Sequence, residues 1–203
     1  MPISPNRMYR DMTPLLTIVP EERKKRLETS YYVEGYATTF DEPYLLWDSG
    51  ETKYFEKIDK KAFKNADMSD VIFQYNHQGR VYARNSNKTL GLEVDKHGLF
   101  VYADLSRTEG AKDLYGDIAA GMITKMSWAF TVAEQSFDRE THTFTILRVR
   151  KVYDVSAVST PANPETEISA RAMIDGEIEK ALLEEKKRRI KILKIRTLLE
   201  ELR

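Results

Sequence analysis

Three side chains, far apart along the chain, have the types needed for nucleophilic catalysis by serine. Ser127 lies in the segment GMITKMSWAF, His77 ends the segment VIFQYNH, and Asp154 lies in VYDVSAVST. A serine hydroxyl is a poor nucleophile until a base takes its proton, so catalysis by Ser127 requires an imidazole within hydrogen-bond reach. Serines within strands are common, and Ser127 taken alone also fits an inert strand residue.

His77 is one of only three histidines in the chain. Strand alternation predicts that it shares an apolar, inward face with Val71, Phe73 and Tyr75. An inward imidazole at a strand end is either a core histidine with satisfied hydrogen bonds or a general base. The neighbouring residues leave both interpretations open.

Asp154 is unusual in its surroundings because both faces of VYDVSAV are largely apolar. A buried carboxylate is costly unless it is paired or hydrogen-bonded. Its partner could be Arg148 or Arg150 in a structural ion pair, or an imidazole N–H in a catalytic triad. His142 is a second candidate for the residue that orients His77, ranked behind Asp154.

The composition excludes several other kinds of site. The chain has 203 residues, no cysteine and a formal net charge of +0. Thiolate nucleophiles, zinc-thiolate sites and iron–sulfur clusters are therefore excluded, and no cofactor or metal is predicted. The neutral charge argues against a nucleic-acid partner. No stretch approaches the roughly 20 apolar residues that span a bilayer, so we expect a soluble, intracellular protein without a membrane partner.

The elements that must position these residues are mainly strands, as the pattern of apolar residues indicates. Runs of β-branched and aromatic residues are separated by turn residues, and residues 95–98 are typical of a hairpin turn. Two short helical pieces are expected, at residues 59–66 and after the capping Thr108. This pattern predicts a β-rich α+β fold, a closed or nearly closed, mostly antiparallel β-barrel flanked by short helices. The expected strands cover residues 30–40, 53–58, 70–77, 90–105, 123–138, 142–150 and 152–160.

The chain divides into three parts by composition. We expect residues 1–29 to be a loose arm that orders against the body, residues 30–164 to be the β-barrel domain, and residues 165–203 to be a charged helical tail. An apolar stripe on the tail needs a partner, so the chain could form a homo-oligomer. The basic residues 186–189 fit a solvated helix face or a contact with nucleic acid or an acidic scaffold.

Several blocks in order resemble the prohead protease family of tailed bacteriophages. These blocks are YYVEGYATTF, YFEKIDKKAF, YNHQGRVYARNSNKTLGLEVDKHGLFVYADL, DIAAGMITKMSWAFTV and VYDVSAVSTPANPETEISA. The resemblance implies a serine endopeptidase that cleaves scaffold and delta-domain segments of the major capsid protein, and itself, inside the immature head in the host cytoplasm. It also implies the fold of the herpesvirus maturation protease.

The resemblance carries functional roles to three positions. The family histidine matches His77, the family serine matches Ser127, and the third position, usually Glu, is Asp154. Lys60 and Lys61 replace the more usual Pro-Gly, at an expected surface turn. The competing interpretation is a non-enzymatic capsid-assembly or scaffolding protein with an oligomerising helical tail.

Overall fold

The computed structural model describes residues 7–15, 26–48, 50–159, 187 and 190–191. The chain divides into two compact units, Met1–Glu167 and Ile168–Arg203. All the strands described here belong to the first unit. The tail expected from residue 165 lies outside the described residues except for Lys187, Ile190 and Lys191.

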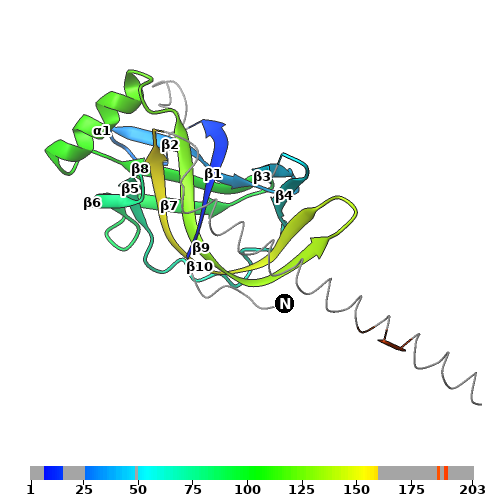
Figure 1. Cartoon of the computed structure of the whole chain (residues 1–203). Coiled ribbons are helices and arrows are strands. Elements are labelled where there is room, and N and C mark those ends of the chain that lie inside the picture. Colours follow the sequence, from blue (N-terminus) through cyan, green and yellow to red (C-terminus); the bar gives the residue numbers. More distant parts are fainter. Residues whose placement is uncertain (1–6, 16–25, 49, 160–186, 188–189, 192–203) are drawn as a thin grey trace, which may run out of the picture. The chain divides into compact units, whose positions relative to one another are not determined.

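The first unit is built from strands with one α-helix among the described residues (Figure 1). In chain order the elements are β1 (Met8–Leu15), β2 (Tyr32–Thr39), β3 (Tyr44–Asp48), β4 (Lys53–Ile58), β5 (Ile72–Tyr75), β6 (Gln78–Arg84), β7 (Leu90–Val94), β8 (Gly98–Asp104), α1 (Glu109–Ala119), β9 (Lys125–Asp138) and β10 (Thr143–Val158). The β-rich α+β class predicted from the sequence is confirmed. None of the described helices is long and apolar enough to cross a membrane.

The strands form two sheets. The larger, seven-stranded sheet has the order β1-β9-β10-β4-β3, and β5 joins it by pairing with both β10 and β6. The smaller sheet has the order β2-β8-β7. β10 pairs antiparallel with β9 and parallel with β4 and β5, while the remaining pairs are antiparallel. β10 is thus the strand that connects the other parts of the larger sheet.

The predicted closed or nearly closed barrel is not found in the part of the chain that the structure describes. Closure requires an uninterrupted ladder of hydrogen bonds around the sheet. β2 packs close to β1 and β9, but it pairs only with β8. Because no such ladder joins β2 to β1 or to β9 among the described residues, the two sheets remain separate.

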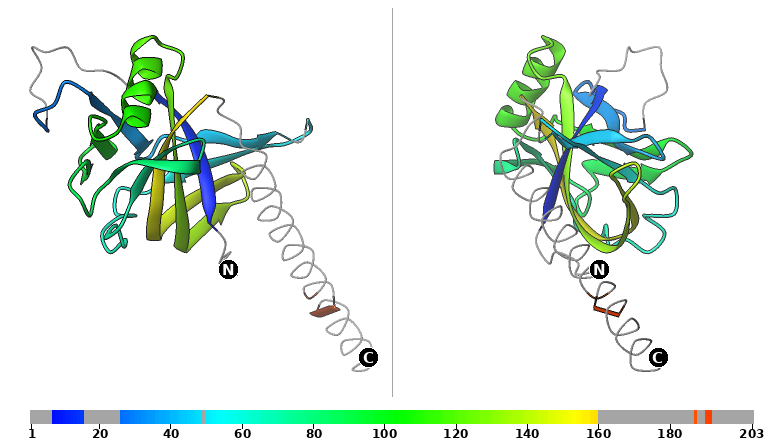
Figure 2. Two further views of the ribbon diagram at one scale, coloured as in Figure 1. Left: turned by 90° about the vertical axis from the view of Figure 1, so that its left-hand side faces the viewer. Right: turned by 45° about the vertical axis from the view of Figure 1, so that its right-hand side comes forward.

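The long β9–β10 hairpin differs from the prediction of two strands at 142–150 and 152–160. A single strand, β10, pairs with β9 along its whole length, and the two ribbons run side by side in Figure 2. Register shifts between Ile146 and Asp154 bend this pair without ending it. A bulge adds one residue to a strand and so breaks the alternation of its two faces. The break in the sequence pattern between residues 150 and 152 therefore does not mark a turn.

The periodicity missed three strands and wrongly predicted a helix at residues 59–66. β1 lies within the expected arm and carries Pro14 near its end, which is tolerated because β1 is at the edge of its sheet. β3 and β6 are the other two missed strands. Residues 60–65, expected to be helical, form successive turns in which Asp59, Lys61 and Phe63 carbonyls each accept from the residue three positions on.

Helix α1 follows the predicted capping pattern. The Thr108 hydroxyl accepts a hydrogen bond of 3.2 Å from the Ala111 N–H and satisfies one of the free donors of the first turn. Gly121, two residues after the helix, has φ of 71°, a conformation that glycine adopts without strain.

Substitution of Phe144 measures how much packing within the β9–β10 hairpin contributes to the free energy of unfolding. Its side chain is fully buried, and its ring centroid lies 4.4 Å from that of Phe137. We expect Phe144→Ala to lower the free energy of unfolding by about 3–5 kcal/mol because it leaves a cavity. Leu45→Ala, at a residue that is 52% exposed, should change it by less than about 0.5 kcal/mol. Equal losses for the two variants in urea unfolding would contradict this packing.

Candidate active site

His77 does not continue strand β5, as alternation predicted, but sits in the two-residue turn between β5 and β6. Tyr75 pairs with Gln78, so Asn76 and His77 form the turn. Their φ angles are 50° and 56°, as in a type I′ hairpin turn. Such φ values are uncommon for residues other than glycine, although Asn and His adopt them more often than most. The turn directs the imidazole inward, and only 4% of the His77 side chain is exposed.

Hydrogen bonds to the end of β10 hold this turn in place. The Asn76 N–H donates to the Ala157 carbonyl at 3.0 Å, and the Asn76 Oδ1 accepts from the Ser159 N–H at 3.2 Å. The His77 N–H donates to the Ser156 hydroxyl at 3.3 Å. These contacts provide the surrounding structure that a strained turn requires.

Ser127 lies in the middle of the larger sheet. Its strand, β9, runs between β1 and β10, and Ser127 is paired with Asp11 on one side and Ser156 on the other. The residue is fully buried. Its Oγ lies 2.6 Å from the Nε2 atom of His77, within hydrogen-bond distance.

A register shift in β10 places Asp154 on the same face as Ser127. Val152 is paired with Phe130, but Asp154 is paired with Ala129, because the shift falls between Val152 and Asp154. Directly paired residues lie on the same face of a sheet. Asp154 therefore joins the face of Ser127 and Ala129, whereas Val152 joins the core with Phe130.

Asp154 is the carboxylate that contacts the imidazole. Its Oδ1 is hydrogen-bonded to the Nδ1 atom of His77 and accepts a second hydrogen bond of 3.0 Å from the Ser156 hydroxyl. Both side chains of the His77–Asp154 pair are almost fully buried. When the imidazole carries its proton on Nδ1 and donates it in a hydrogen bond to the Asp154 carboxylate, the lone pair of Nε2 can accept the proton of Ser127.

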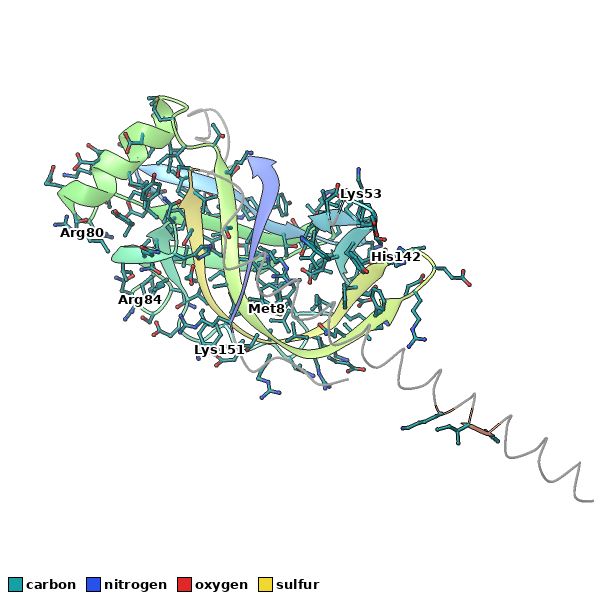
Figure 3. All side chains as sticks on the ribbon, in the orientation of Figure 1. Met8, Lys53, Arg80, Arg84, His142 and Lys151 are labelled. Carbon is teal, nitrogen blue, oxygen red and sulfur yellow. The ribbon has the colours of Figure 1, made fainter. Side chains whose placement is uncertain are left out.

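The other side chains considered as partners of Asp154 or His77 do not contact them. Arg148 contacts Glu134 at 3.5 Å, and Arg150 is exposed, so the structural ion pair suggested for Asp154 is wrong. His142 lies at the tip of the β9–β10 hairpin, at the opposite end of β10 from Asp154 (Figure 3). Its ring packs on Tyr54, with centroids 5.4 Å apart.

Ser156 and Arg10 belong to the site but were not found by sequence reasoning. The Ser127 hydroxyl also contacts the main-chain carbonyl of Arg10 at 3.1 Å. Ser156 lies two residues after Asp154 in the sequence, so strand alternation puts it on the same face, and this was a usable signal. Arg10 gave no such signal because it lies in the segment expected to be a loose arm.

The Arg10 side chain belongs to a buried polar cluster with Glu56 and Tyr44. Arg10 donates to Glu56 through Nε at 2.5 Å and Nη2 at 2.9 Å, and the Tyr44 hydroxyl donates to the same carboxylate. Burial lowers the pKa of Arg10, but the attraction and hydrogen bonds of Glu56 outweigh it and raise this pKa above its usual value. Burial, then the Glu56 charge, raises the pKa of Tyr44. Arg10 and Glu56 form a salt bridge that is almost fully buried.

A serine, an imidazole and a carboxylate in one hydrogen-bonded line are typical of serine hydrolases. A family model described as caudovirus prohead serine protease matches residues 20–180 of the chain. The chain therefore belongs to the family of caudovirus prohead serine proteases. No curated protein and no solved structure matched it.

Ser156 should matter because it binds both Asp154 and the His77 backbone. We expect Ser156→Ala to slow the reaction of the chain with a fluorophosphonate, which requires an activated serine, by about tenfold, since a hydrogen bond to a charged group is lost. Ser156→Thr keeps the hydroxyl and should restore most of the rate. Ser136→Ala, at an exposed serine of the same hairpin, is the matched control. An unchanged rate in Ser156→Ala would exclude this positioning role.

Proposed function

We propose that the chain is a maturation endopeptidase that cleaves scaffold and delta-domain segments of the major capsid protein inside the immature head. Ser127 is the nucleophile, His77 the general base and Asp154 the residue that orients the imidazole. The single observation that carries these roles is the hydrogen-bonded line from Asp154 through His77 to Ser127. Membership of the prohead serine protease family supports the substrate class and the location within the procapsid.

The proposed reaction proceeds by acyl transfer. The Nε2 atom of His77 takes the hydroxyl proton while Ser127 Oγ attacks the carbonyl carbon of the scissile bond. The imidazolium, stabilised by Asp154, then gives this proton to the leaving amine. Water hydrolyses the ester on Ser127 by the same proton transfers in the second half of the reaction.

The shorter side chain of Asp154, where glutamate is more usual, is compatible with this role. The turn that carries His77 is hydrogen-bonded directly to β10, the strand of Asp154. This close approach of the two backbones compensates for the missing methylene. The Ser156 hydroxyl donates a further hydrogen bond of 3.0 Å to Asp154 Oδ1, which helps to hold the carboxylate in place.

The proposal also assigns binding partners to the segment after Pro164. The charged segment after Pro164 docks on helical scaffold or capsid segments, and the chain cleaves itself as well as its substrate. Homo-oligomers form through the apolar stripe of the same segment. Truncation at about Ala172 tests the docking role, because it should prevent incorporation into the immature head formed in the host cytoplasm.

The test of the proposed function is co-expression with the major capsid protein encoded by the same phage. We expect the intact mass of the capsid protein to fall by one defined segment with the wild-type chain and to remain unchanged with Ser127→Ala. Ser136→Ala should process the capsid protein normally. Assembled heads with identical capsid masses for all three chains would support a non-enzymatic assembly protein instead.

A further inference from the structure

Strand β1 lies directly against the nucleophile. It pairs antiparallel with β9 from Met8 to Leu15, and Asp11 is the residue opposite Ser127. With β1 in place, Ser127 has no exposed surface. A peptide substrate therefore cannot reach the Ser127 Oγ in this state of the chain.

β1 also competes for the proton on which the proposed mechanism depends. The Ser127 hydroxyl has one hydrogen and two acceptors, His77 Nε2 at 2.6 Å and the Arg10 carbonyl at 3.1 Å. Donation to Arg10 turns the proton away from the base. The strand thus opposes activation of the serine as well as access to it.

The way β1 is held allows it to leave as a unit. It is the terminal strand of the larger sheet and pairs with β9 alone. Its ladder has a register shift between Met12 and Leu15. Among the described side chains of this strand, Arg10 binds Glu56 in an ion pair that is almost fully buried, and Met8 packs into the core. Release of β1 would expose a strand edge of β9 with free main-chain donors and acceptors next to Ser127.

We propose that this edge of β9 is the binding site for an extended segment of the substrate polypeptide, and that β1 occupies the site and keeps the chain latent. The inference rests on the proposed function of Ser127. An extended peptide that replaces β1 regains the main-chain hydrogen bonds of the ladder, as in recognition by strand addition. Its backbone then passes Ser127 in the position that β1 now holds, with a scissile carbonyl within reach of the Oγ.

A reversible disulfide between β1 and β9 tests this proposal in the full chain. Leu15 and Lys125 are directly paired, and opposite residues of antiparallel strands have Cα separations that a disulfide can bridge. The natural chain has no cysteine, so Leu15→Cys with Lys125→Cys forms a defined link. The readout is the rate at which a fluorophosphonate forms a bond to Ser127 Oγ with loss of fluoride, followed by intact mass.

We expect the oxidised double-cysteine chain to be labelled at least about tenfold more slowly than the same chain after reduction, because β1 can no longer open. Arg10→Ala, which weakens the hold on β1, should be labelled faster than the wild type. Arg148→Ala removes an exposed arginine elsewhere and should have no effect. Circular dichroism establishes that each chain is folded.

Two outcomes would overturn the proposal: equal labelling of the oxidised and reduced chains, or labelling of folded Arg10→Ala that is no faster than that of the wild type. Failure of the proposed function gives a different result. In that case the adduct would persist in Ser127→Ala, or capsid protein would remain uncut by every variant.

Discussion

The hydrogen-bonded line from Asp154 through His77 to Ser127 requires three distant chain segments to meet at one place. β10 makes this possible because it pairs with β9 along one edge and with β5 along the other. Ser127 arrives on β9, and His77 arrives on the turn that ends β5. The site is therefore a property of β10 and its two neighbours, and the smaller sheet contributes none of the three side chains.

Burial makes this arrangement both specific and vulnerable. Ser127, Asp154 and Ser156 lie within a sheet whose other face is packed with Trp128 and Phe130, which stack with centroids 3.8 Å apart. In such surroundings a polar group without a partner is expensive, whereas a connected set is tolerated. The Arg10–Glu56–Tyr44 cluster follows the same rule. Loss of one member leaves a buried charge, so this cluster couples the position of β1 to the rest of the sheet.

The sequence predicted the β-rich class, helix α1 and the residues of the line, but not how the residues are brought together. Strict alternation placed His77 at the end of a strand, yet a positive-φ turn directs its side chain inward. Strict alternation would also put Asp154 on the face of Val152, two residues before it, and only the register shift separates them. Bulges and left-handed turns depend on tertiary contacts that a single sequence does not reveal. β1 was hidden for the same reason, because its stability comes from β9 and from a buried ion pair.

The central claim is that His77 and Asp154 act as one unit on Ser127. The most direct measurement is the rate of capsid-protein cleavage in immature heads that contain His77→Ala, Asp154→Ala or the double variant. If Asp154 acts only through His77, the double variant should cleave no more than about threefold more slowly than His77→Ala alone. A double variant whose loss equals the product of the two single losses would show that the two residues act independently and would contradict the account.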